Sequence, residues 1–334
     1  MTAGTPVLPR ASATRLPAAE RWRELRSVSR GDATYKTLLT ILAALLPLLL
    51  TIIVSELVVG AWPAIKAFGL HFLVNSVWDP VAGQFGALPL IFGTLYSSLV
   101  ALVIAVPLAL GVSIFLTEFA PRKLRTPVAT MVELLAGVPS VIYGLWGMFV
   151  LIPLLRDVLW PIVRPVLGHL PFFSGPFDGP SVLAGGTILA IMCLPYIAAV
   201  SREVLLAVPS SQREAALALG ATRWEAVWTV ILPYGRAGIF GAIVLGLGRA
   251  LGETMAVTML IGNRHEIGLS LTQPGYTIAA AIANEFAEAA SSMHLSALVY
   301  AGLVLFFITV MVNACARWLI WRVARGSAAG SAAI

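Results

Sequence analysis

Charged residues and cysteines are scarce in this sequence. Only 11% of its 334 residues are charged and 59% are apolar, whereas soluble domains carry about 25% charged residues. The two cysteines, Cys193 and Cys315, both fall in apolar stretches. We expect small apolar side chains at these positions, and neither a metal cluster nor an extracytoplasmic disulfide. The composition excludes a soluble globular domain and indicates a membrane protein.

Motifs for nucleotide and cofactor binding are also missing. No GxxxxGK[ST] loop is present, so the chain is not expected to bind ATP itself. The glycines of segment 246–252 have the wrong spacing for a dinucleotide fingerprint. The four histidines are scattered over predicted external segments and membrane edges: His71, His169, His265 and His294. We assign none of them a ligand role, and the sequence predicts no catalytic site, no metal and no cofactor.

Long apolar runs are what the sequence has in abundance. Six runs reach or exceed the roughly 20 residues that cross about 30 Å of hydrocarbon. They cover 37–62, 89–119, 128–153, 181–200, 237–262 and 295–320. We therefore predict an all-α membrane protein with six transmembrane helices. The first 36 residues lack the early apolar core of a cleavable signal, so the first span is expected to remain as an anchor.

The distribution of Lys and Arg predicts the orientation of the spans. Seventeen of the 22 Lys and Arg residues fall before the first span, in the loops after spans two and four, or after span six. Four fall on the other side, and Arg249 lies within span five. Basic residues accumulate on the cytoplasmic side, so both termini are predicted to be cytoplasmic. The basic residues flank the spans and form no patch that would bind nucleic acid.

Prolines mark the predicted irregular positions. Pro107, Pro139 and Pro195 lie inside spans and are expected to kink them, because proline removes a backbone donor. The external segment 154–180 is proline-rich, so its helices are expected to be interrupted. The external segment 263–294 is predicted to hold a turn at Pro274 and a short helix whose Glu285 and Glu288 face outward.

One span carries two opposite charges. Arg249 and Glu253 are four residues apart in the apolar segment 246–262, so one helical turn would bring their side chains together. A lone charge in mid-membrane costs about 2.5–3.5 kcal/mol on insertion scales. Two interpretations stay open: the pair lines a path for a solute, or it is a structural ion pair that locks span five against another helix.

The segment 208–233 is the most organised part outside the predicted spans. Ser211 followed by Glu214 fits a capping box that would start one helix, and Gly220 would end it. Thr222 followed by Glu225 fits a second capping box, whose helix would run to position 233. We predict two short helices that meet at a glycine elbow. The elbow would dock on another protein or lie on the membrane surface.

The elbow resembles the EAA loop of ABC-importer permeases. Glu214, Ala215, Ala216 and Gly220 match that motif, and Val230 stands where its usual residue is Ile. The segments 133–147, 248–262 and 274–289 are similar to those of phosphate-specific permeases of the PstC type. The resemblance covers about 38–318 and implies the type I ABC-importer permease architecture. It implies a tail at 1–36, a first helix and external segment at 37–88, a permease core at 89–320 with its coupling loop at 201–236, and a tail at 321–334.

The resemblance also implies partners and a substrate. A PstA-type sister permease, a PstB-type ATPase dimer and an extracytoplasmic phosphate-binding protein would complete an importer in a prokaryotic cell membrane. Glu214, Ala215, Ala216 and Gly220 would couple transport to ATP hydrolysis, and Arg249 and Glu253 would lie on the phosphate path. Alternatives are a permease for sulfate or molybdate, a passive anion channel, and an intramembrane enzyme, which ranks lowest because no span holds a histidine.

Overall fold

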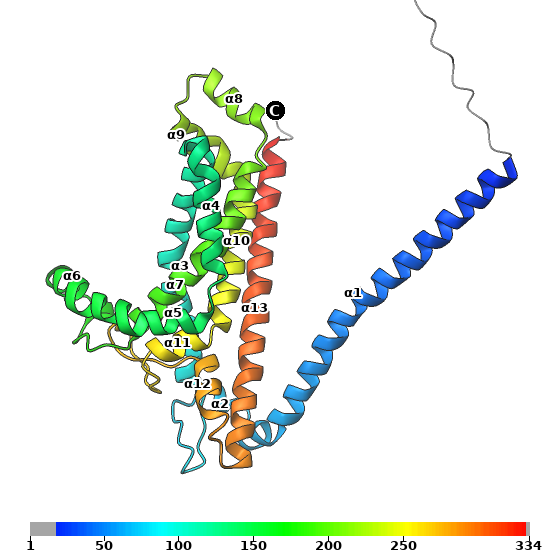
Figure 1. Ribbon diagram of the computed structural model, residues 1–334. Coiled ribbons are helices and arrows are strands. Elements are labelled where there is room, and N and C mark those ends of the chain that lie inside the picture. Colours follow the sequence, from blue (N-terminus) through cyan, green and yellow to red (C-terminus); the bar gives the residue numbers. More distant parts are fainter. Residues whose placement is uncertain (1–17, 332–334) are drawn as a thin grey trace, which may run out of the picture. The chain divides into compact units, whose positions relative to one another are not determined.

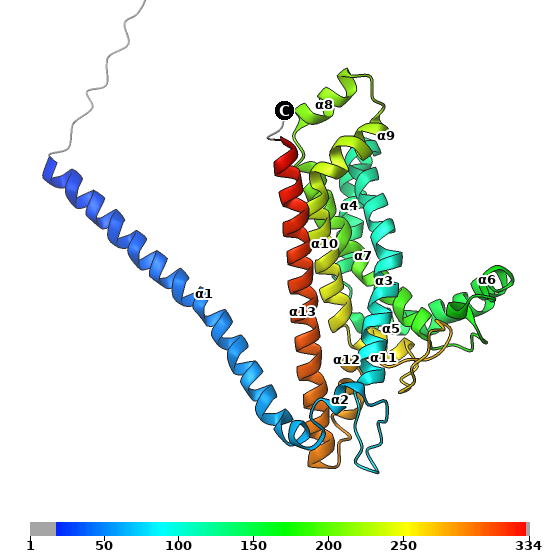
Figure 2. The same cartoon turned by 180° about the vertical axis from the view of Figure 1, so that it is seen from behind.

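The computed structural model describes residues 18–331 of the chain. The chain divides into two units, Met1–Glu56 and Leu57–Ile334. Figures 1 and 2 show the helices from opposite sides. Positions 1–17 and 332–334, which belong to the two predicted tails, lie outside the described residues.

The described part of the first unit is a single helix. Helix α1, Ala18–Phe68, contains the predicted span 37–62 and ends in the second unit. It begins inside the segment predicted as a tail, so positions 18–36 are helical. The cytoplasmic location predicted for the N-terminus stays a prediction.

The second unit consists of helical segments joined by short loops. Apart from two isolated bridges, no strand occurs among the described residues. After α1 the helical elements are α2 His71–Val74, α3 Leu88–Ile114, η1 Phe115–Phe119, α4 Arg122–Ala136, α5 Ser140–Trp146, η2 Gly147–Leu151, η3 Leu154–Leu159, α6 Trp160–Leu167, η4 Pro171–Phe173, α7 Val182–Leu206, α8 Ser210–Ala218, α9 Arg223–Ala226, η5 Val227–Ile231, α10 Leu232–Gly252, α11 Met255–Leu260, α12 Ile278–Glu285 and α13 Ser292–Ser331.

Six helical segments of the described chain are long and apolar enough to cross a membrane. They are Asp32–Phe68, Leu88–Phe119, Ser140–Leu167, Val182–Leu206, Arg223–Gly252 and Ser292–Arg322. The predicted number and helical class are confirmed. The predicted third span, 128–153, is wrong because Pro139 starts a new helix with an extended ψ of 138° and leaves α4 as a separate element. The predicted fifth span, 237–262, is wrong because its helix ends at Gly252.

Several prolines follow π-helical turns and do not interrupt the helices as predicted. The structure has four π-helical turns among the described residues, and each ends two residues before a proline. They precede Pro121, Pro153, Pro161 and Pro233. A wider turn avoids the clash of the proline ring with the preceding carbonyl. The predicted interruption of 154–180 is therefore wrong up to Leu167, where α6 ends with Pro165 inside it.

Helix α7 forms the centre of the second unit. Buried residues make up 67% of its most apolar window, against 28–39% in the other spans of this unit. It packs against α3 and α10 (Figure 2). Small residues of α3 such as Ala101 and Ala105 are fully buried at this contact, and Ser113 Oγ donates a 2.9 Å hydrogen bond to the carbonyl of Ala198. Small and hydroxyl side chains are typical of helix contacts in membranes.

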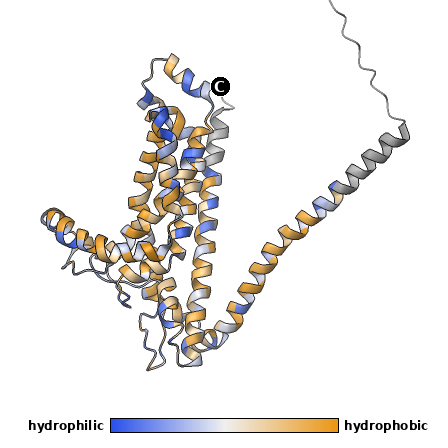
Figure 3. Cartoon of the chain, viewed as in Figure 1, coloured by the Kyte–Doolittle hydropathy of each residue, from blue (hydrophilic) through white to orange (hydrophobic). Residues whose placement is uncertain are grey.

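Apolar residues predominate along the spans of the second unit (Figure 3). Large side chains of α3 such as Leu99 and Val103 are 57% and 66% exposed. Hydrocarbon solvates such side chains without cost, so their exposure is expected for a protein whose solvent is the bilayer. Helices α8 and α9 lie at one end of the bundle with the C-terminal end of α13, and α2 and α12 lie at the other end (Figures 1 and 2).

Candidate functional site

The two charges of the fifth span lie at a break in the helix. Arg249 belongs to the last turn of α10, whereas Glu253 follows its end with an extended ψ of 132°. The chain resumes as α11 at Met255. Glycines at 246, 248 and 252 weaken the helix here, since each costs about 1 kcal/mol relative to Ala. The prediction of one continuous helix through both charges is wrong, but their contact is confirmed: Arg249 Nη2 lies 3.6 Å from Glu253 Oε2.

The ion pair leaves part of the arginine unpaired. A separation of 3.6 Å exceeds hydrogen-bond length, so the attraction is mainly Coulombic. The side chain of Glu253 is 7% exposed, and that of Arg249 is 36% exposed. The Nε atom of Arg249 is buried and has no hydrogen-bond partner among the described residues. A buried donor without a partner costs about 1–3 kcal/mol, so the Nε–H group is left able to donate to a further oxygen.

An aromatic ring supports the guanidinium from α7. The Arg249 Cζ atom lies 5.1 Å from the centre of the Tyr196 ring, within the range of a cation–π interaction. The Tyr196 hydroxyl donates a 3.1 Å hydrogen bond to the carbonyl of Ala136, the last residue of α4. Tyr143 Oη donates to the carbonyl of Leu135 next to it, at 2.8 Å. The arginine is thus connected to the chain break between α4 and α5.

The two breaks lie close together. Helix α5 packs against α11, and a Cβ atom on Gly144 would lie 2.5 Å from Met259 Sδ and 3.3 Å from Ala256 Cα. A larger residue at this position would require Met259 and the Ala256 backbone to shift. Non-helical backbone at membrane depth occurs where protein buries it or where it lines a water-filled cavity. The pair of breaks therefore positions polar groups inside a region that is otherwise apolar.

The elbow at 208–233 has one of its two predicted caps. Thr222 Oγ1 accepts from the backbone nitrogen of Glu225, and Glu225 Oε2 accepts from the backbone nitrogen of Thr222, so this capping box is confirmed. Gly220 has a φ of 89°, which confirms the predicted left-handed turn. The box at Ser211 and Glu214 is wrong: Pro209 is the N-cap of α8, and Ser211 lies inside the helix.

The EAA-type residues divide into exposed and buried members. Glu214, Ala215 and Gly220 are exposed, whereas Ala216 is only 8% exposed and packs inside the elbow. Leu219 is 89% exposed, although the sequence analysis did not single it out. Its exposure could have been predicted from its position directly before Gly220, the glycine that ends the helix.

The structure brings together residues that the sequence analysis treated as scattered. Glu285 Oε2 accepts a 2.8 Å hydrogen bond from Trp78 Nε1 and lies 3.1 Å from His294 Nε2, and Glu285 Oε1 lies 3.6 Å from His265 Nε2. The prediction that Glu285 faces outward is wrong, because its side chain is 16% exposed, whereas Glu288 is exposed. Burial lowers the pKa of His265. No group able to hold a metal ion occurs within the described chain.

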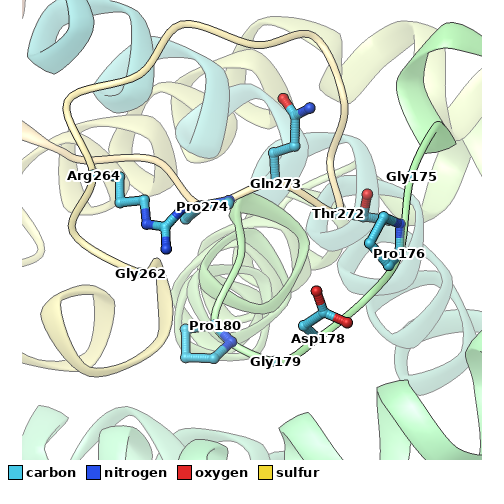
Figure 4. Close-up of a pocket in the computed structure, with 10 residues that line it drawn as sticks. All are labelled: Gly175, Pro176, Asp178, Gly179, Pro180, Gly262, Arg264, Thr272, Gln273 and Pro274. Carbon is cyan, nitrogen blue, oxygen red and sulfur yellow. The ribbon is translucent and has the colours of Figure 1, made fainter.

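A separate pocket opens between two loops near the same end of the molecule. It has a volume of about 390 Å³ and lies between segments 175–180 and 262–274. Figure 4 shows Asp178 on one wall and Arg264 on another. Neither Arg249 nor Glu253 lines it, so it is distinct from the charged break.

Six long apolar helices in the described chain, with a charged pair where one of them ends, are the features of a membrane-spanning transport subunit. The family model described as "Binding-protein-dependent transport system inner membrane component" matches residues 105–325. The chain belongs to this family.

Curated relatives cover nearly the whole chain. It is 45% identical to "Phosphate transport system permease protein PstC" of Mesorhizobium japonicum, over 92% of this chain and 96% of the relative. The protein of the same name from Pasteurella multocida is 48% identical over 83% of this chain and 87% of the relative. "Phosphate transport system permease protein PstC 2" of Mycobacterium tuberculosis is 40% identical over 88% and 93%.

Solved structures share the fold. A bacterial alginate ABC transporter in complex with an alginate pentasaccharide-bound periplasmic protein matches with a TM-score of 0.57 and 18% identity, over 89% of this chain and 97% of that chain. At this identity the likeness concerns the fold alone, which is that of an ABC-importer permease.

Proposed function

We propose that this chain is a permease subunit of an ATP-driven importer of inorganic phosphate and forms half of its path. The observation that carries the proposal is the Arg249–Glu253 pair at the break between α10 and α11, with a buried Nε that has no partner among the described residues. A guanidinium is a planar fork of donors that matches the oxygens of phosphate. The names of the curated relatives favour phosphate over sulfate or molybdate as the oxyanion.

Glu253 balances the charge of Arg249 while the path is empty. The Arg249 side chain is 36% exposed and its Nε atom is buried, so without a counter-charge it would be destabilising. The 3.6 Å separation is long enough for a phosphate oxygen to replace the carboxylate as the nearest acceptor. A competing carboxylate also speeds release of the anion. The position of both residues at a helix break favours a path-lining role over a purely structural ion pair, because irregular backbone at this depth typically lines a cavity.

Phosphate import needs an energy source. The cytoplasm is electrically negative, so each negative charge brought inward costs about 2.3 kcal/mol per 100 mV. Helix α8 would provide the mechanical coupling, with Glu214, Ala215 and Gly220 exposed to an ATPase and Ala216 packed beneath them. The absence of a phosphate-cradling loop from this sequence is consistent with hydrolysis on another subunit.

Exposed surfaces of the second unit support a sister permease of the PstA type. The side chain of Arg249 is 36% exposed. On the same helix, nothing lies within 4 Å of a Cβ placed on Gly241, Gly248 or Gly252. No described segment of this chain packs against these three positions, and the partner would make that contact. Small residues permit such an approach.

The remaining partners would occupy the two ends of the bundle. A PstB-type ATPase dimer would bind at α8, and a phosphate-binding protein would dock at the opposite end. The excess of Lys and Arg supports cytoplasmic termini in the inner membrane of a prokaryote. The shared end of α8 and α13 is consistent with this orientation (Figure 1). The core would span 89–320, with its coupling loop at 201–236 and tails at 1–36 and 321–334.

The test is uptake by the purified complex in proteoliposomes. Labelled phosphate should enter only with ATP and the binding protein, and sulfate should not compete. Arg249→Lys keeps the charge and removes the fork, so it should abolish most uptake. Preferred uptake of sulfate would contradict the phosphate assignment, and flux without ATP would support a channel. Full uptake by the Arg249→Lys complex would remove Arg249 from the path.

A further inference from the structure

We propose that Arg213 is the positioning residue that transmits displacement of α8 to α7 and α3. The inference rests on the coupling role proposed for α8. Arg213 is the fourth residue of α8, and its guanidinium points back toward the bundle. Nε donates to Glu118 Oε1 at 3.2 Å, Nη1 to the carbonyl of Val208 at 2.8 Å, and Nη2 to the carbonyl of Leu205 at 2.6 Å.

Two of these bonds fasten α8 to α7. Leu205 lies in the last turn of α7, and Val208 lies two residues beyond its end. Carbonyls at a helix C-terminus lack intrahelical partners and carry partial negative charge, so a guanidinium is favoured there. The pair of bonds fixes the orientation of the planar group as well as its position. A displacement of α8 therefore displaces the end of α7 with it.

The third bond fastens α8 to α3. Glu118 lies in the π-helical turn η1 that continues α3, 95 positions before Arg213. The side chains of Arg213 and Glu118 are only 24% and 16% exposed, so water screens this pair less than a surface ion pair. A cavity of about 340 Å³ lies against the pair, and Arg223 and Leu206 also line it. The cavity leaves room for the three elements to shift.

The helices fastened by Arg213 reach the charged break. Helix α7 carries Tyr196, on which Arg249 rests, and it is bonded to α3 through Ser113. A displacement of α8 is thus transmitted through one side chain to α7, whose Tyr196 contacts Arg249, and to α3, which is bonded to α7. The Arg213 side chain projects from the face of α8 that is turned toward the bundle. The exposed face of α8 therefore remains free to contact the ATPase.

The experiment measures phosphate uptake and ATP hydrolysis by the same reconstituted complex. Arg213→Met and Glu118→Gln should retain hydrolysis, while uptake per ATP falls about two- to thirtyfold, the range for mutations along a coupling route. Uptake per ATP in Arg213→Lys should lie between that of these two variants and that of the wild type, since lysine keeps the charge and loses the forked set of donors. Arg223→Met is the control, because it removes a cation from the wall of the same cavity and none of the three bonds.

A structural role alone predicts a different pattern. Uptake and hydrolysis would then fall together with the yield of complex, and their ratio would stay at the wild-type value, which would overturn the proposal. An equal loss in Arg223→Met would overturn it too, since cavity charge would then be the cause. A wild-type complex that fails to take up phosphate contradicts the proposed function instead.

A distance measurement tests the role of Arg213 even in a complex that takes up no phosphate. Spin labels at Ser211 and Leu206, both exposed, report the position of α8 relative to the end of α7. Cys315→Ser removes the exposed thiol from the background. In the complex the distribution of distances between the two labels should be narrow with and without ATP, and it should broaden in Arg213→Met. An unchanged distribution in that variant would overturn the proposal.

Discussion

Arg249 and Tyr196 are 53 positions apart in the chain, yet the guanidinium of one lies 5.1 Å from the ring centre of the other. The tyrosine also holds the last carbonyl of α4. One ring thus has two separable tasks: it supports the charge at the α10–α11 break and secures the end of α4 at the α4–α5 break.

These two tasks predict different effects at position 196. Tyr196→Leu removes the cation–π contact, which is worth about 0.5–2 kcal/mol, so the KM for phosphate should rise about two- to thirtyfold. Tyr196→Phe keeps the ring and removes only the hydrogen bond, so KM should stay near wild type while the maximal rate falls. Uptake kinetics of the reconstituted complex measure both. Equal KM values in the two variants would contradict the assignment.

Removing both charges should destabilise the protein less than removing one. Arg249→Ala leaves Glu253 buried without a counter-charge, which costs about 3–5 kcal/mol for a fully buried pair, and the lower end applies because Arg249 is 36% exposed. The double variant Arg249→Ala/Glu253→Ala leaves no such charge. Thermal unfolding in detergent and the yield of complex should rank the double variant above the single one. Equal stability would mean that the two charges are not energetically coupled.

The contact of α5 with α11 predicts intolerance at Gly144. Gly144→Ala places a methyl group 2.5 Å from Met259 Sδ and 3.3 Å from the Ala256 backbone, and overpacking of this kind costs about 1–3 kcal/mol. Gly241→Ala is the control, because nothing lies within 4 Å of its Cβ position. Thermal unfolding should separate the two variants. Met259→Ala in the Gly144→Ala background should restore part of the loss.

The His265 environment predicts a dependence of stability on pH. Burial lowers the pKa of His265, and the nearby Glu285 carboxylate opposes this shift. The unfolded chain therefore takes up the proton at a higher pH than the folded chain. Stability should be constant above about pH 6.5, the ordinary pKa of histidine, and decline as the pH falls through 6.5 toward the lower pKa of the folded state.

Unfolding temperatures from pH 8 to pH 5 measure this effect, with His265→Gln as the variant that should lose most of the slope. Glu285, His294 and Glu288 border the same cavity as His265, so His294→Gln is measured in parallel. A slope that persists in His265→Gln would contradict the assignment of the pH dependence to His265.

Reversing the charge at Glu214 should uncouple hydrolysis from uptake. Glu214 is exposed on α8 and does not cap it, so Glu214→Lys should leave the permease folded and change only the surface offered to the ATPase. Asp32→Lys makes the same charge change at an exposed position of α1, outside the coupling loop at 201–236, and should have little effect. The measurement is phosphate taken up per ATP hydrolysed. Wild-type coupling in Glu214→Lys would remove α8 from the coupling role.

Features set by a few neighbouring residues could be predicted from the sequence. Three such features are the number of spans, the contact of Arg249 with Glu253, and the cap of Thr222 with Glu225. Each depends on residues that lie close together in the sequence. Hydropathy and local spacing determine them directly. The left-handed Gly220 is of the same kind.

Contacts between distant segments could not be predicted. Arg213 meets Glu118 across 95 positions, and Trp78 meets Glu285 across 207. These pairs arise from how the helices pack, and periodicity within one helix carries no information about the neighbour it will meet. The sequence also did not predict the break after Gly252. The apolar run continues to 262, and hydropathy does not indicate where the backbone hydrogen bonds of a helix stop.

The partial exposure of Arg249 has a consequence for biogenesis. A copy inserted alone would leave a guanidinium on a face open to acyl chains, and hydrocarbon solvates that group poorly. Solitary copies should be short-lived substrates for membrane proteases, and balanced synthesis with whatever covers that face becomes a requirement of the cell. The same charged side chain that would serve transport thereby makes unassembled chains recognisable for degradation.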